Sequence, residues 1–179
     1  MPTSLLTELG HDALVRYYRF AIGSSPEHVW VATDAEPRAG EGAVIGGCVL
    51  SDDPSGVMKR FVRFGPLYFA GDLGRAMIAS GSLRRRLVQG LRGGSDGGHK
   101  PEVTQIFTDA KRRGEGLGAQ LLRTCEATLS QRGTRKYFVH TQRDDNEAGI
   151  RFYRREGFEV IGESRSFGEA FLVMQKELD

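Results

Sequence analysis

The sequence predicts a mixed α/β fold that forms one domain over residues 1–179. Three observations lead to this prediction. The chain has the length of a single domain, and its composition, 39% hydrophobic and 27% charged, is that of an ordinary globular protein. Apolar segments with strand-like alternation are interleaved with amphipathic helical segments, and two strand-like segments close the sequence. This order is typical of a mixed sheet that is covered by helices.

The N-terminal part contains one predicted helix and two predicted strands. Apolar residues recur at helical spacing over Asp12–Ile22, and Asp12 is a suitable N-cap for that helix. Val29–Thr33 alternates as a strand, residues 36–42 are typical of a turn, and Val44–Leu50 is the expected antiparallel partner. No strand is evident before the helix.

A basic insertion separates these strands from the rest of the chain. Residues 57–92 are expected to be mostly helical, and the glycine-rich stretch 93–98 is expected to be a flexible linker. Residues 55–100 contain nine basic and two acidic residues, whereas the whole chain has a net charge of only +2. The predicted helix carries a leucine stripe and an arginine cluster: Leu83, Leu87 and Leu91 form the stripe, and Arg84, Arg85, Arg86 and Arg92 lie on its other faces.

The C-terminal part alternates strands and helices. We expect strands over Val103–Thr108 and Lys136–Gln142, helices over Ala119–Ser130 and within 146–158, and a final pair of strands over Glu159–Glu163 and Ala170–Lys176.

A glycine-rich turn, Arg113–Gly118, joins the first of these strands to the first helix. Glycines let a ligand approach the backbone, and the unpaired N–H groups and dipole of the helix start suit a pyrophosphate. The turn is a poor match to the dinucleotide fingerprint. The five residues 109–113 separate the strand from the glycines, and the next strand ends in Gln142 rather than in an acidic residue. No nucleotide-triphosphate P-loop pattern exists in the sequence. The turn therefore predicts another phosphorylated cofactor.

Two motifs resemble the GNAT superfamily of acetyltransferases. Arg113, Gly116 and Gly118 fill the [QR]-x-x-G-x-[GA] signature, and 146–158 resembles the N-x-x-A-x-x-F-Y-x-x-x-G-F run that follows it. The resemblance covers 102–178, is loose over the first fifty residues and is absent over 54–100. It implies a three-layer fold, with a central mixed, mostly antiparallel sheet flanked by helices and a helical insertion before the fourth strand.

The resemblance also implies acetyl-coenzyme A as cosubstrate and a set of residues that bind it. A bulge in the fourth strand would separate it from the fifth and free a backbone N–H for the acetyl carbonyl. The residues implied for cofactor binding are Phe107, Thr108, Arg112, Arg113, Gly114, Gly116, Gly118, Ala119, Asn146 and Tyr153. Asn146 and Tyr153 are seven residues apart, so their side chains are expected to face the same way on a helix.

The activity implied is N-acetyl transfer to a primary amine by direct attack in a ternary complex. Glu102, eleven positions before Arg113, is the candidate base, and Tyr153 is the candidate acid that protonates the departing thiolate. His140 shares a strand face with Phe138 and is a second candidate base or a structural residue. The alternative is a catalytically weak acyl-coenzyme A binding or regulatory module on the same fold.

The acceptor stays open. A small-molecule amine or an amino sugar, possibly phosphorylated, is expected, and an amino sugar on a nucleotide or lipid carrier, an antibiotic and a protein N-terminus are alternatives. The basic insertion is interpreted as a lid over the acceptor, with guidance of an anionic acceptor or peripheral membrane contact as alternatives. Nucleic acid is disfavoured because the basic stretch lacks interleaved aromatics. No metal site is expected, since the histidines are dispersed. Cys48 and Cys125 are expected to be buried free thiols, and a cytoplasmic monomer or homodimer is expected, without secretion signal or membrane span.

Overall fold

The computed structural model describes residues 10–34, 42–68, 70–71, 74, 99–166 and 168–178. The predicted linker over 93–98, the leucine stripe and its arginine cluster lie outside these residues, as do most of the turn over 36–42 and any strand before residue 10. Of the predicted helical insertion over 57–92, the first part is helical, as Val57–Phe64 (α3).

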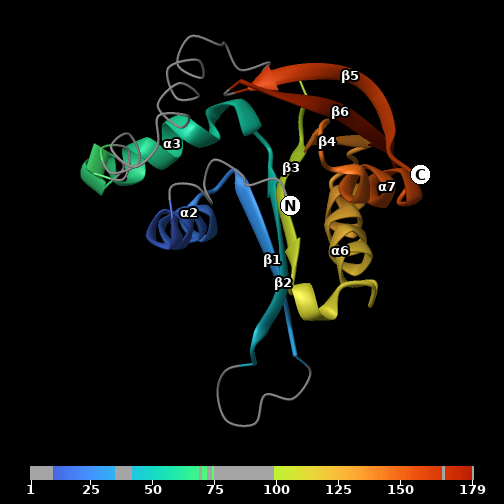
Figure 1. Ribbon diagram of the computed structural model, residues 1–179, viewed down its shortest axis with the longest axis horizontal. Helices are drawn as coiled ribbons and strands as arrows, with labels where there is room; N and C mark the ends of the chain where they lie inside the picture. Colours follow the sequence, from blue (N-terminus) through green and yellow to red (C-terminus); the bar gives the residue numbers. More distant parts are fainter. Residues whose placement is uncertain are drawn as a thin grey trace.

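A six-stranded mixed sheet forms the centre of the molecule (Figure 1). Its strands are β1 (Glu27–Thr33), β2 (Val44–Ser51), β3 (Glu102–Thr108), β4 (Lys136–Gln142), β5 (Glu159–Ser166) and β6 (Glu169–Glu177). The spatial order is β1-β2-β3-β4-β6-β5, and every neighbouring pair is antiparallel except β3 and β4. The predicted mixed, mostly antiparallel sheet is confirmed, and β3 takes the place of the family's fourth strand.

Helices cover both faces of this sheet and make the fold three-layered. Figure 1 shows α2 (His11–Gly23) and α3 on one face, and α6 (Leu117–Gln131) and α7 (Glu147–Arg155) on the other. Two short 3-10 turns, η1 (Pro54–Gly56) and η2 (Ala110–Arg112), follow β2 and β3 respectively. In the described ranges, no helix is both long enough and apolar enough to cross a membrane.

Each helical layer has its own apolar core. The larger one lies under α6 and α7, where Leu122, Cys125 and Leu129 of α6 cluster with Tyr137 and Val139 of β4, all with at most 1% of their surface exposed. Burying a large apolar side chain contributes roughly 1.5–3 kcal/mol, so this layer fixes α6 against the sheet.

The smaller core lies under α2 and α3 and is mostly aromatic. Tyr17 and Phe20 of α2 contact Phe61 of α3 with ring centroids 5.7 and 5.6 Å apart, and Val49 of β2 joins them. The free thiols of Cys48 and Cys125 are buried in the other core, as the sequence predicts.

A buried ion pair ties α3 to the edge of the sheet. The side chain of Glu27 on β1 is 0% exposed, and its Oε1 accepts from Arg60 of α3 at 2.5 Å and from Ser51 at 3.1 Å. The same guanidinium pairs with Asp53 beside η1. Moving α3 away would leave the Glu27 carboxylate buried without a partner, which costs free energy of folding. The ion pair therefore holds α3 against the edge of the sheet.

One local prediction is wrong. The first helix begins at His11, and its N-cap is Gly10 with φ 95°, a left-handed angle that glycine adopts readily. Asp12 therefore lies in the first helical turn, where its negative charge is close to the positive end of the helix dipole. Its side chain makes no capping hydrogen bond.

Candidate functional site

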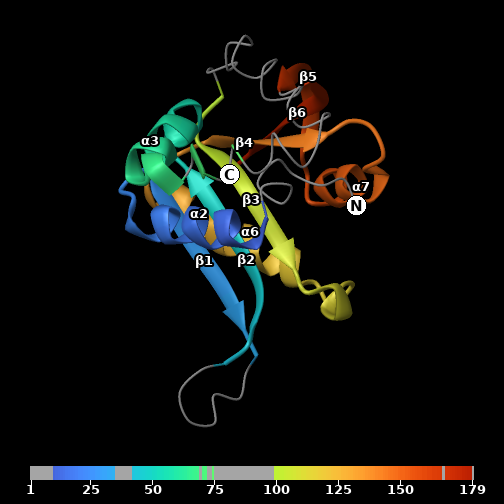
Figure 2. The same ribbon diagram turned by 60° about the vertical axis from the view of Figure 1, so that its left-hand side comes forward.

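The parallel strands β3 and β4 pair only over a short stretch, at the start of β3 and the middle of β4. Their register contains two partner pairs, Glu102 with Phe138 and Val103 with Val139, and Figure 2 shows the strands diverging beyond that point. The expected separation of these two strands is confirmed. It leaves one edge of β3 without a neighbouring strand inside the sheet.

A bulge in β3 coincides with the point of divergence. Val49 of β2 pairs with Gln105 while Leu50 pairs with Val103, so Thr104 is the extra residue on β3. Its hydroxyl donates to the carbonyl of Val49 at 3.3 Å. The bulge that the resemblance implied in this strand is therefore present.

The direction of the backbone N–H groups on β3 follows from one hydrogen bond at its end. Asp109 donates its N–H to the carbonyl of Ile45 at 2.8 Å, toward β2. Because alternate residues of a strand point to opposite edges, the N–H of Phe107 also points to β2, and those of Ile106 and Thr108 point into the gap toward β4. The resemblance pointed to Phe107 and Thr108 but not to Ile106, because the direction of each N–H group cannot be assigned without the partner strand.

The glycine-rich turn follows η2 and starts α6. Gly114 and Gly116 have φ of 89° and 79°, and Gly116 is the N-cap of the helix. The N–H of Gln120 donates to Gly116 at 3.0 Å as the first intrahelical bond, so the N–H groups of the preceding turn are not used within the helix. Both glycines thus serve the left-handed turn itself, because a Cβ on either would contact nothing within 4 Å.

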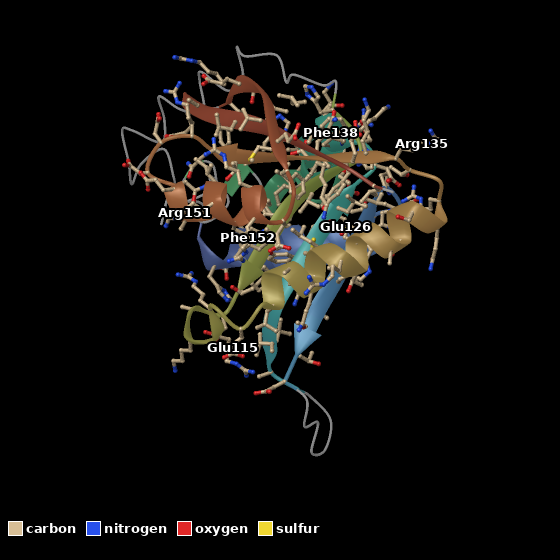
Figure 3. All side chains as sticks on the ribbon, turned by 90° about the vertical axis from the view of Figure 1, so that its right-hand side faces the viewer. Glu115, Glu126, Arg135, Phe138, Arg151 and Phe152 are labelled. Carbon is tan, nitrogen blue, oxygen red and sulfur yellow. The ribbon has the colours of Figure 1, made fainter. Side chains whose placement is uncertain are left out.

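Gly118 has a different role from the other two glycines. A Cβ there would lie 3.1 and 3.2 Å from ring carbons of Phe152, so the missing side chain lets α7 approach the start of α6. Figure 3 shows Phe152 near this end of α6, just beyond Glu115 in the turn. Ala119, the next residue, is 8% exposed and faces the core.

The two arginines of the turn differ in their surroundings. Arg112 donates to Glu115 at 2.7 Å and to Asp34 at 3.3 Å, and its hydrogen bond to the Glu115 carboxylate raises the pKa of the guanidinium. Arg113 is exposed at the point where η2 ends.

Glu102 and His140 lie against each other where β3 and β4 begin to part. His140 Nδ1 is 2.9 Å from Glu102 Oε1, and the side chains are 20% and 12% exposed. His99 lies beside them, with its ring 6.1 Å from that of His140 and 5.0 Å from that of Phe138. The sequence named Glu102 and His140 separately, and the structure brings them into contact.

Tyr153 and Asn146 occupy opposite ends of α7. Tyr153 is buried between Phe152 and Phe158, whose ring centroids lie 5.2 and 5.4 Å from its own. Burial raises the pKa of its phenol, so the hydroxyl stays protonated at neutral pH. Asn146 is the N-cap residue of α7, and its amide donates to Thr141 at 2.8 Å at the end of β4.

An aromatic surface lies on the α2 face of β3. Phe107 is 40% exposed, and its ring rests on Gly47, where a Cβ would come within 2.6 Å of a ring carbon. The ring of Tyr18 on α2 contacts it edge-on at 5.8 Å, and burial raises the pKa of Tyr18 to about 12. The two adjacent glycines of β2 are the signal in the sequence from which this close approach could have been predicted.

The fold, the parted strands and the glycine turn define an acetyltransferase of the GNAT type. Residues 6–158 match the acetyltransferase (GNAT) family, and the chain belongs to that family. It is accordingly an acyltransferase. Among curated proteins, none matches the chain. Over the described residues, no group of three or more His, Cys, Asp or Glu side chains is placed to hold a metal ion.

Solved structures share this fold at low sequence identity. Nourseothricin acetyltransferase is 19% identical with a TM-score of 0.52, over 87% of this chain and 67% of that one. The PaiA N-acetyltransferase from Thermoplasma acidophilum, solved with coenzyme A, is 13% identical with a TM-score of 0.53, over 93% and 70%. A chain of the NatC complex, solved with Gag peptide and CoA, is 14% identical with a TM-score of 0.55, over 94% and 81%. At these identities the likeness is one of fold.

Proposed function

We propose that this protein is an N-acetyltransferase that moves an acetyl group from acetyl-coenzyme A to a primary amine by direct attack in a ternary complex. The observation that carries the proposal is the parting of β3 from β4. It leaves the N–H groups of Ile106 and Thr108 directed into a gap that has the Glu102–His140 contact at its closed end.

The cofactor is proposed to span from the glycine turn to this gap. The N–H groups at the start of α6 and the helix dipole suit the pyrophosphate, and the pantetheine arm would lie along the free edge of β3. Two of the similar structures were solved with coenzyme A. Arg113, the exposed arginine of the motif, is the proposed cation beside the phosphates.

The reaction needs a base, an oxyanion donor and an acid. The amine nitrogen attacks the acetyl carbonyl while Glu102 accepts the amine proton, directly or through one water. A backbone N–H of Ile106 or Thr108 donates to the oxyanion of the tetrahedral intermediate. The intermediate then expels the thiolate, and the phenol of Tyr153 supplies its proton. Because no nucleophilic Cys or Ser is paired with a base among the candidate site residues, we infer direct transfer.

The acceptor is proposed to bind on the α2 face of the sheet. Glu102, Phe107 and Tyr18 all lie there, and the exposed part of the Phe107 ring offers a flat apolar contact beside the reacting carbonyl. A small-molecule amine or amino sugar with an apolar face fits this contact.

The two buried free thiols are in keeping with action in the reducing cytoplasm, where we propose the enzyme works as a monomer or homodimer.

Thiol release from acetyl-coenzyme A in the presence of a panel of amines tests the function. The panel should contain arylalkyl amines, amino sugars and a peptide N-terminus, and acetylated products should be identified by mass spectrometry. We expect steady turnover with at least one amine and its loss in Glu102→Gln. Coenzyme A binding without turnover across the panel would instead support an acyl-coenzyme A binding module.

A further inference from the structure

We propose that Glu102 and His140 act as one proton-accepting pair. The Glu102 carboxylate receives the amine proton, and His140 beside it sets the pH above which the carboxylate can do so. This inference rests on the proposed acetyl transfer. It assigns to His140 the part of a positioning residue that acts through Glu102.

The parallel register of the two strands creates the pair. Glu102 is aligned with Phe138, so residue 140 follows two positions along β4, and alternation places its side chain on the same face as that of Phe138. The imidazole then meets the carboxylate across the parting strands, with 2.9 Å between Nδ1 and Oε1. Both side chains are mostly buried but still reach the surface, at 20% and 12% exposure, as a proton-transfer pair requires.

The contact decides the tautomer of His140. A carboxylate only accepts hydrogen bonds when ionised, so Nδ1 carries the hydrogen in the neutral ring and Nε2 carries the lone pair. A lone carboxylate ordinarily titrates near pH 4 and an imidazole near pH 6.5. Because Nδ1 already carries a hydrogen, the proton that Glu102 takes from the amine stays on the carboxyl group, and the proton that the pair gains in the range of an imidazole goes to His140 Nε2. The ring is then cationic and makes the neighbouring carboxylate a weaker base, so neutral His140 is the state in which the pair accepts the amine proton.

The titratable side chains described around the pair are two tyrosines, a histidine and a lysine. Tyr17 of α2 and Tyr153 of α7 both lie within electrostatic reach of Glu102, and burial raises the pKa of each phenol, so both stay neutral at physiological pH. His99 is another titratable ring beside the pair: it packs edge-on against His140, and among the described residues its buried Nδ1 has no hydrogen-bond partner. The only described cation nearby on β4, Lys136, lies over the ring of Phe138.

The first test is the pH dependence of kcat for His140→Asn, at saturating acceptor so that titration of the free amine does not contribute. The amide still offers a donor to Glu102 but does not titrate. We expect the acidic limb to move to lower pH by about one unit or more, toward the range of a carboxylate. The Kd for coenzyme A should not change. An acidic limb that stays in place would overturn the proposal.

A matched control exists on the far edge of the sheet. His28 on β1 contacts Asp52 at 3.0 Å with exposures of 32% and 31%, and Arg132, the residue just after α6, also pairs with Asp52. His28→Asn removes the same chemical group from a similar contact outside the proposed site. It should leave the acidic limb unchanged, and an equal shift in this variant would show that the effect of His140→Asn is not specific, which also overturns the pair.

A second measurement needs no turnover and no folded His140 variant. NMR titration of the His140 ring should give a midpoint that falls by about one pH unit in Glu102→Gln, because the amide can accept the hydrogen bond without supplying a negative charge. An unchanged midpoint together with an active wild-type enzyme would overturn the pair alone. Absence of acetyl transfer by the wild type would overturn the proposed function, and with it the catalytic part of the pair.

Discussion

Replacing Gly116 by Asp is the sharpest test of where the cofactor binds. Gly116 has φ 79° and a Cβ there would contact nothing within 4 Å, so the fold resists a side chain only through the left-handed backbone. That conformation costs roughly 1–2 kcal/mol for an L-residue, and Asn and Asp tolerate it best. Against a stability of about 5–15 kcal/mol for a typical domain, the variant should fold.

The charge is what should weaken binding of coenzyme A, and comparison with Gly116→Asn isolates its effect. A carboxylate about 5 Å from a phosphate charge, at an effective dielectric constant of 20–80, costs about 1–3 kcal/mol. We therefore expect the Kd for coenzyme A to be roughly 5- to 150-fold higher in Gly116→Asp than in Gly116→Asn. Calorimetry at two salt concentrations measures both, and the difference should shrink at high salt. Equal Kd values for the two folded variants would refute binding of the pyrophosphate at this turn.

Three further predictions concern catalysis, the aromatic surface and the edge of the sheet. Glu102→Gln and Tyr153→Phe should each lower kcat by about 10²-fold or more, with little change in the Kd for coenzyme A, and a wild-type kcat in either variant would remove that residue from the mechanism. Gly47→Ala should displace the Phe107 ring, raise the acceptor KM and cost about 1–3 kcal/mol of stability, whereas an unchanged acceptor KM would place the acceptor elsewhere. Glu27→Ala should cost about 3–5 kcal/mol in denaturant unfolding, because the arginine of α3 loses its buried partner, and a loss below 1 kcal/mol would contradict the anchoring role.

The elements were predicted well because their signals are local. Strand β4 occupies the predicted range Lys136–Gln142, since apolar alternation and the flanking turn act over a few residues. The N-cap of α2 was predicted wrongly because it depends on a backbone angle and not only on residue type. Asp12 has the right chemistry for a cap, but the chain turns at Gly10, and a φ of 95° is not visible in a list of residue types.

The roles of the motif glycines show the limit of a motif. Its spacing correctly placed Gly116 at the start of a helix, where a left-handed turn is needed. The same motif suggested that Gly118 makes room for phosphate, whereas a Cβ there would meet the ring of Phe152 from another helix. Motif spacing constrains the backbone around a residue, but it does not say what packs against it.

The sequence by itself determined the family, the order of strands and helices, and the separate candidates Glu102 and His140. Only the tertiary structure decided that these two side chains touch, because their contact depends on the parallel register of strands that are 34 residues apart at Glu102 and Lys136. It also decided, through the pairing of the end of β3 with β2, which N–H groups of β3 face the gap. Local propensities act over a few neighbouring residues, whereas register and strand separation are set by the packing of both cores together.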